Sequence, residues 1–308
     1  QDAAVRVWIR ICTERIERLP PLSHKSMSNT ELCMFIRPLI LSAIAVITII
    51  LAGCVAITDH NEPRLSCTST SDIPDSVQIV SGTPNVVLDG VGWVAGIPSK
   101  ISLWDRRADN HQVSPETVAE VARHLRSHEM NSVLVRVNQY DPIGEWVRLC
   151  RNKNLPLGWR LTGGTFETLK YTLLPGRIFG EDWYNPFTES LHMYSDIPAL
   201  GVHEAVYAHR VRTHDKPGAY ATLKIIPILG MWHETTSTKE ALEYFSEHGT
   251  LEEREEAYRI LYPSYGGSWG AGLGSLVPFG SAWTRIVGSA FGHAANGVRT
   301  MIREDASR

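Results

Sequence analysis

The sequence predicts an α+β fold, with a small mixed sheet followed by a long apolar helix and a helical C-terminal part. Two observations predict it. Strand and helix signals alternate between residues 86 and 161, a pattern that is typical of α/β units. From residue 196 onward, the clearest signals are capping residues and apolar runs that indicate helices.

Two strands are expected at the start of the domain. Residues 86–89 and 100–104 are short apolar runs, separated by a turn that contains Gly and Pro. Ser114 and Pro115 then open a helix whose apolar side chains recur with a period of 3.6. The valine-rich residues 132–137 indicate the next strand, so this part is expected to form an α/β unit.

A second helix is expected to run from Pro142 to Cys150, and residues 158–161 are expected to add a strand. Residues 189–194 alternate polar and apolar side chains, as a half-buried strand does. This strand leads directly into an apolar helix at residues 196–210. The rest of the domain is expected to be organised around that helix.

The C-terminal part has two features. Thr250 and Glu253 form the capping box of a charged helix that reaches Tyr262. Residues 265–284 carry no charge, and such a segment with regularly spaced glycines either packs closely against another helix or inserts into a membrane as a hairpin. The glycines that recur at every fourth position are Gly266, Gly270 and Gly274.

Composition excludes one class of partner. The chain has 308 residues, of which 43% are hydrophobic and 20% are charged, and its formal net charge is −3. It therefore lacks the basic excess that nucleic-acid binding requires. An ordinary globular domain with no nucleic-acid partner is expected.

The N-terminal part has the layout of an export signal. Residues 38–52 form an uncharged apolar run preceded by Arg37, too short for a comfortable membrane span. The run ends in Leu51-Ala52-Gly53-Cys54, which resembles the lipobox of bacterial lipoproteins. The resemblance implies that Cys54 carries lipid and anchors the protein to a bilayer. A plain signal peptide or a membrane anchor is the alternative.

Five parts of the chain are expected. Met27 is a natural start, with Met34 as a second candidate, because the residues before Met27 show no signal character. Residues that precede the domain are rich in Ser, Thr, Asp, Asn and Pro, which is typical of a tether. The parts are an over-extended reading frame (residues 1–26), a lipoprotein signal peptide (27–53), a flexible tether (54–84), the zincin-like α/β domain that is described below (85–264), and a Gly-rich apolar segment with a C-terminal helix (265–308).

The helix expected at residues 196–210 carries the candidate site. Asp196 or Ser195 can cap its first amide groups. Its apolar residues indicate a buried helix, yet His203 and Glu204 stand side by side in it. In the zinc hydrolase motif H-E-x-x-H, two histidines one turn apart bind the metal and the glutamate activates the metal-bound water. The fifth position here is Tyr207, so the second histidine is missing.

The strand and helix at residues 184–209 together resemble the active-site region of the zincin peptidases. In glutamate-type zincins the third metal ligand is a glutamate on a later helix. Glu234 follows an apolar stretch downstream and lies where that ligand would be expected, with His233 as the neighbouring competitor. The resemblance thus implies a zincin-like domain with zinc as its cofactor.

The resemblance implies that His203, Tyr207 and Glu234 are the metal ligands and that Glu204 is the catalytic base. Such a set would bind zinc weakly, because a phenol with a reference pKa near ~10 must lose its proton to bind. His209 does not replace the missing histidine, since it lies roughly 120° around the helix from His203.

Three functions follow from these residues. In the first, a membrane-anchored lipoprotein has a catalytically impaired metallopeptidase-like domain and acts in binding or scaffolding of a peptide or protein. In the second, it is an active zinc-dependent peptidase with an unusual ligand set. In the third, the His-Glu pair is a coincidence in a structural envelope lipoprotein without metal. The expected location is the cell membrane or outer membrane, facing the periplasm or the exterior.

Overall fold

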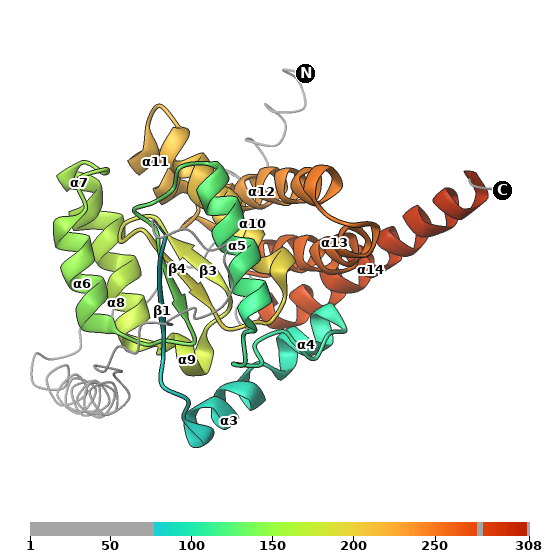
Figure 1. Ribbon diagram of the computed structural model, residues 1–308, viewed down its shortest axis with the longest axis horizontal. Coiled ribbons are helices and arrows are strands. Elements are labelled where there is room, and N and C mark those ends of the chain that lie inside the picture. Colours follow the sequence, from blue (N-terminus) through green and yellow to red (C-terminus); the bar gives the residue numbers. More distant parts are fainter. Residues whose placement is uncertain (1–76, 276–279, 307–308) are drawn as a thin grey trace, which may run out of the picture. The chain divides into compact units, whose positions relative to one another are not determined.

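The computed structural model describes residues 77–275 and 280–306, all of which belong to one compact unit, residues 51–308 (Figure 1). They form an α+β fold with a small mixed sheet and many helices, which confirms the predicted class at this level. The expected reading frame, the signal peptide, Cys54 and most of the tether lie outside the described residues.

The sheet has four strands in the order β1-β2-β4-β3. β1 (Gln78–Ser81), β2 (Leu134–Val137) and β4 (Ser190–Met193) are parallel, and β3 (Trp183–Asn185) runs antiparallel to β4 at the edge. β2 and β4 are buried along their whole length, as expected for parallel strands covered on both faces. Because β1 starts at Gln78, the folded part begins before residue 85, inside the segment expected to be a tether.

Helices surround this sheet (Figure 1). In chain order they are α3 (Val86–Ala95), α4 (Ile97–Leu103), α5 (Pro115–Ser127), α6 (Pro142–Arg151), α7 (Leu157–Trp159), the π-helical turn η1 (Arg160–Gly164), α8 (Thr165–Leu173), α9 (Gly176–Phe179), α10 (Pro198–Thr213), α11 (Pro217–Leu223), α12 (Pro227–His248), α13 (Leu251–Gly274) and α14 (Gly280–Ala306). The helices α5, α6 and α10 and the strands β2 and β4 agree with the sequence-based expectations.

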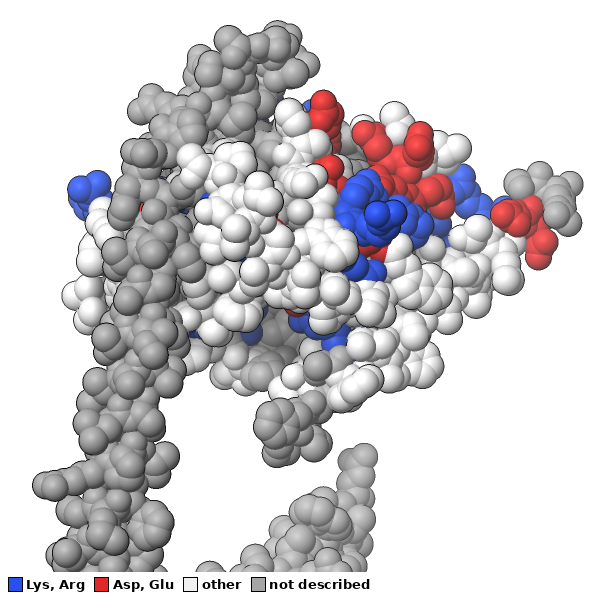
Figure 2. Space-filling view, turned by 90° about the horizontal axis from the view of Figure 1, so that it is seen from below, with Lys and Arg blue, Asp and Glu red and all other residues white. Residues whose placement is uncertain are grey.

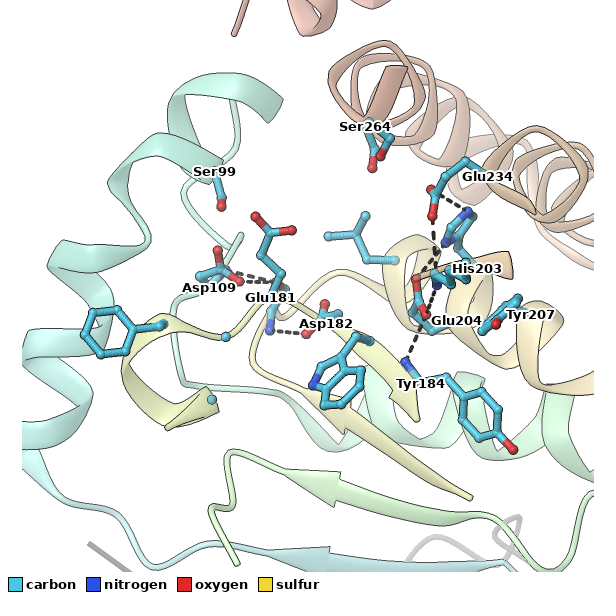
Figure 3. Close-up of a pocket in the computed structure, with 18 of the residues that line it drawn as sticks. Ser99, Asp109, Glu181, Asp182, Tyr184, His203, Glu204, Tyr207, Glu234 and Ser264 are labelled. Carbon is cyan, nitrogen blue, oxygen red and sulfur yellow. Dashed lines mark hydrogen bonds and ion pairs between the residues drawn. The ribbon is translucent and has the colours of Figure 1, made fainter. Parts of the chain in front are cut away.

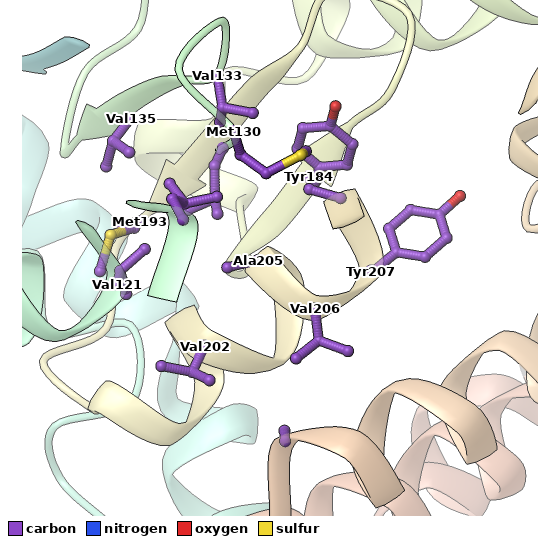
Figure 4. Close-up of a cluster of buried hydrophobic side chains, with 14 of the residues drawn as sticks. Val121, Met130, Val133, Val135, Tyr184, Met193, Val202, Ala205, Val206 and Tyr207 are labelled. Atoms are coloured by element: carbon purple, nitrogen blue, oxygen red, sulfur yellow. The ribbon is translucent and has the colours of Figure 1, made fainter. Parts of the chain in front are cut away.

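The core lies between α10, α5 and the sheet (Figure 4). Ten of the sixteen residues of α10 are buried, so this helix is central as predicted. The close approach of α10 to α5 and β4 requires a glycine at position 201, because a Cβ there would lie 2.5 Å from a methyl group of Val121 on α5 and 3.1 Å from Met193 on β4. A helix packed this closely holds its polar side chains in fixed positions.

Three expected strands are wrong. Residues 86–89 and 100–104 belong to the helices α3 and α4, and residues 158–161 are helical in α7 and η1. At α3 the Asn85 side chain accepts hydrogen bonds from the backbone N–H groups of Val87 and Leu88, which is an N-cap. The local cap therefore outweighs the β-propensity of the valines.

The expected cap of α10 is also wrong. The N-cap residue of α10 is Ile197, and no side chain caps this helix. The Asp196 carboxylate instead accepts hydrogen bonds from the Ser114 backbone N–H, the Ser114 hydroxyl and the Thr117 hydroxyl, at 2.9, 2.6 and 2.7 Å. Asp196 thus fastens the start of α5 to the start of α10.

The capping box at Thr250 is present, but α13 continues beyond Tyr262 as far as Gly274. The expected boundary at residue 265 therefore falls inside one helix. Gly266 and Gly270 lie against the backbone of α14, where an added Cβ would clash with the carbonyl oxygens of Gly288 and Thr284. The glycines thus allow two long helices to pack backbone to backbone.

Candidate functional site

A cavity of about 670 Å³ opens between α10, β3, α8 and the α13–α14 pair (Figure 3). Polar side chains from distant parts of the chain line it in two groups. One group comes from α10 and α12, and the other from the segments before β3 and before α5. The polar lining residues used below are Asp109, Asp182, Ser195, His203, Glu204, Lys224 and Glu234.

The structure brings His203, Glu204 and Glu234 together at this cavity. The His203 Nδ1 atom lies 3.2 Å from Glu204 Oε1, and its Nε2 atom lies 3.6 Å from Glu234 Oε2. Glu234 comes from the second turn of α12, the later helix that the resemblance implied. The remaining oxygen of Glu204 accepts a hydrogen bond of 2.9 Å from the Tyr184 backbone N–H on β3.

A lysine that the sequence analysis did not assign to the site completes it. The Lys224 Nζ atom lies 3.2 Å from Glu204 Oε2 and 3.9 Å from Glu234 Oε1, so one ammonium group serves both carboxylates. It also lies 3.9 Å from the centre of the Tyr207 ring, a cation–π distance. The one available signal was that Lys224 is the only charged residue between Ala219 and Trp232.

The Tyr207 hydroxyl makes no hydrogen bond to the other expected ligands, His203 and Glu234. Its ring lies beneath the Lys224 ammonium, and its buried hydroxyl has no hydrogen-bond partner among the described residues. Burial and then the Glu204 carboxylate raise the pKa of Tyr207 well above its ordinary value. The phenol therefore keeps its proton, and a phenolate ligand is strongly disfavoured.

The neighbouring histidines lie elsewhere. His233 packs edge-on against Tyr220, with ring centres 4.1 Å apart, and burial lowers its pKa to about 4. His209 stacks on His128, with ring centres 4.1 Å apart, and it does not line the cavity, which agrees with its expected position around the helix from His203. Within residues 77–275 and 280–306, no three His, Cys, Asp or Glu side chains form a group that could hold a metal ion. The residues present thus fit zinc poorly.

The buried charges at α10 stabilise each other. Burial raises the pKa of Glu204, but the Lys224 ammonium and His203 outweigh this and hold it well below its ordinary value. Burial lowers the pKa of His203, but the hydrogen bond to Glu204 and the charge of Glu234 raise it overall. The pKa of Lys224 is raised by the same carboxylates, despite burial. Glu204 is therefore a weak base, and the imidazolium form of His203 is favoured.

A second group of carboxyl side chains faces the same cavity (Figure 3). Asp182 Oδ1 accepts hydrogen bonds from the backbone N–H groups of Tyr194 and Ser195, at 2.5 and 3.0 Å. The Ser195 hydroxyl donates to Asp109 Oδ1 at 3.3 Å. Burial, together with the nearby Asp109, raises the pKa of Asp182 to about 8, so this group is a carboxylic acid near neutral pH. The sequence analysis missed it, because only the fold places residue 182 beside residue 109.

No protein-family model, curated protein or solved structure matches this chain. The function of the chain is therefore inferred from the geometry and electrostatics of the cavity.

Proposed function

We propose that this chain is a membrane-anchored lipoprotein whose zincin-like domain has lost peptidase activity and binds a peptide or protein segment in its cavity. Lipid on Cys54 would hold it at the cell membrane or outer membrane, facing the periplasm or the exterior. The observation that carries the loss of catalysis is the Lys224 ammonium between Glu204 and Glu234.

Lys224 supplies the positive charge that a metal would supply to the same carboxylates. Zinc needs a neutral imidazole as a ligand, whereas His203 is held toward its protonated form by two carboxylates. Glu204 would have to accept a proton from water, but its pKa is depressed by Lys224. The expected ligands His203 and Glu234 and the expected base Glu204 are thus all held by ion pairs within the protein.

The cavity favours a peptide with apolar and basic side chains. Its volume of about 670 Å³ lies in the range of specific ligand sites. Aromatic side chains supply apolar contact area, and the ionisable carboxyl groups offer partners for a cationic side chain. The residues concerned are Phe166, Phe179, Trp183 and Phe187 for the apolar wall and Asp109 and Glu181 for the carboxyl groups. Glu181 pairs with Arg285, but its side chain is 53% exposed and can accept a further partner.

Zinc titration by calorimetry tests the loss of catalysis, with the full chain at neutral pH. Wild type is expected to bind no zinc, and Tyr207→His alone is expected to bind little, because Lys224 still occupies the carboxylates. Lys224→Met combined with Tyr207→His should bind zinc more tightly by orders of magnitude, because two neutral imidazoles and Glu234 become available. Adding His203→Ala to this double variant is the control, and it should abolish the gain.

Tight zinc binding by wild type that depends on His203 and Glu234 would overturn the proposal. It would favour the active peptidase, for which the 3.6 Å approach of these two side chains is the supporting observation. Failure of the double variant to bind zinc would show that the site geometry is not zincin-like.

Ligand binding has its own test. Fluorescence anisotropy with a panel of labelled peptides that carry both basic and aromatic residues should detect binding without cleavage. Trp183→Ala, in the cavity wall, should weaken it, whereas Leu161→Ala, outside the cavity and 65% exposed, should not. No binding by any peptide would contradict the binding role and favour a structural envelope protein.

A further inference from the structure

The helices α3 and α4 are apolar but exposed. Gly92 is the one buried residue of α3, and large apolar side chains project into solvent along both helices. A helix that is apolar on all sides is normally buried in a protein core or in a membrane. The side chains that define this apolar face are Val86, Val87, Val91, Val94, Ile101 and Trp104, each 49% exposed or more.

No charge interrupts the apolar face. The two helices contain two charged residues, Asp89 and Lys100, and both are turned inward. Asp89 accepts hydrogen bonds from Asn138 at 3.0 Å and from Arg177 at 2.9 Å. The Lys100 ammonium donates to the backbone carbonyls of Trp93 and Asp109. Surface helices usually direct such groups toward water, so their inward position leaves an outer side suited to an apolar environment.

The uncharged surface continues beyond these helices. Trp104 stacks on His293 of α14 with ring centres 3.9 Å apart, so α4 adjoins α14. α14 exposes a further stripe of apolar side chains, which includes Trp283, Val287 and Phe291. Seen from below α3 and α4, the described surface is largely uncharged, and the charged side chains gather mainly in one cluster (Figure 2).

No single helix among the described residues is long and apolar enough to cross a membrane. Taken together, α3 and α4 have the necessary length and hydropathy, although the pair is bent by 49°. Core helices of globular proteins meet it too, but those are mostly buried, whereas α3 has one buried residue of ten and α4 has three of seven. We propose that the apolar face lies in the interfacial region of a lipid bilayer, so that the domain rests on the membrane.

Two observations favour a bilayer over another occupant. Trp104, which is 72% exposed, lies at the C-terminal end of the bent pair, and tryptophan is the side chain most suited to the membrane–water boundary. The chain between Cys54 and Gln78 could span up to roughly 80 Å when extended, so a lipid on Cys54 would keep a bilayer within reach of α3, which follows β1 in the chain. The inference rests on the proposed lipid anchor only for this second point.

Photolabelling from the lipid tests the inference. The full chain is reconstituted in vesicles of phosphatidylethanolamine and phosphatidylglycerol that contain a phospholipid with a diazirine in its acyl chain. Adducts are then mapped by mass spectrometry. Residues 86–104 should carry several-fold more adducts than residues 157–164, where Leu157 and Leu161 are 60% and 65% exposed.

A pair of acidic substitutions provides the matched comparison. Val87→Asp with Val94→Asp should lower the labelling of residues 86–104 several-fold, whereas Leu157→Asp with Leu161→Asp should leave it unchanged. All four positions are exposed, so both double variants should fold, which circular dichroism can verify.

Equal labelling of the two segments, or none on residues 86–104, would overturn the inference. Crosslinks from residues 86–104 to a second copy of the chain, in place of lipid adducts, would overturn it as well. The lipid anchor is judged separately, by mass spectrometry of Cys54, so its failure is distinguishable from failure of the apolar face.

Discussion

Replacement of Lys224 by methionine tests the charge network most directly. The substitution keeps an apolar side chain of similar length and removes the ammonium group. Glu204 and Glu234, whose side chains are only 8% and 18% exposed, then lose their shared partner. Removal of one partner from a buried ion pair typically costs ~3–5 kcal/mol. Because Lys224 itself is 26% exposed, water can partly replace it, and we expect a loss of about 3 kcal/mol near neutral pH.

The stability lost in Lys224→Met should be greater near neutral pH than in acid. The folded-state pKa of Glu204 is depressed, so its stabilising contribution is present above the unfolded-state pKa of ~4.3 and disappears as the pH falls through the folded-state value. Without Lys224 this depression shrinks. The difference in free energy of unfolding between wild type and Lys224→Met should therefore be largest near neutral pH and should decrease below about pH 4.

Urea denaturation followed by tryptophan fluorescence measures both quantities. Lys170→Met is the matched control, because Lys170 lines the same cavity but is 46% exposed and pairs with Glu167 in the same helix. Glu167 is only 10% exposed, but the Lys170 ammonium is nearly half exposed to water, so its loss should cost about 1 kcal/mol. Equal destabilisation by the two substitutions, or a loss at Lys224 that does not change with pH, would refute the network described for Glu204.

Three further outcomes are expected. Cys54→Ser should release the protein from the membrane fraction or block its processing, and unchanged attachment in cell fractionation would exclude the lipid anchor. Asp182→Asn should stabilise the domain above about pH 8 by on the order of 1 kcal/mol, because the raised pKa of Asp182 makes the stability of wild type fall as the pH rises from ~4 through 8. A free energy of unfolding that depends on pH in the same way for wild type and variant would contradict this. Gly266→Val should lower the thermal unfolding midpoint by several degrees by forcing α13 away from α14, whereas Gly297→Ala, at an open position, should not.

The sequence was informative where local patterns determine structure. The alternation of residues 189–194 and the apolar run of residues 196–210 correctly indicated β4 and α10, although β4 is fully buried and not half-buried as the alternation predicted. The position of Glu234 beside His203 was also anticipated, although from a family resemblance and not from a physical argument.

Contacts between residues far apart in the sequence could not be predicted from such local patterns. Lys224 reaches Glu204 through the turn between α11 and α12, and no local pattern encodes that turn's direction. Asp196 illustrates the same limit, because its position predicted a cap for its own helix, whereas the fold presents it to Ser114 and Thr117, about 80 residues earlier. The error at α3 had a local cause: the valines were given more weight than the Asn85 cap.

The hydrogen bond from Tyr184 to Glu204 has a consequence for the edge of the sheet. β3 is an edge strand, and an outward N–H group on such a strand can recruit a strand from another molecule. The Glu204 carboxylate occupies that group at 2.9 Å, and Lys224 keeps the carboxylate ionised. The Glu204 carboxylate of this cavity thus also satisfies the edge strand, and its removal would leave a buried N–H group of β3 without an acceptor.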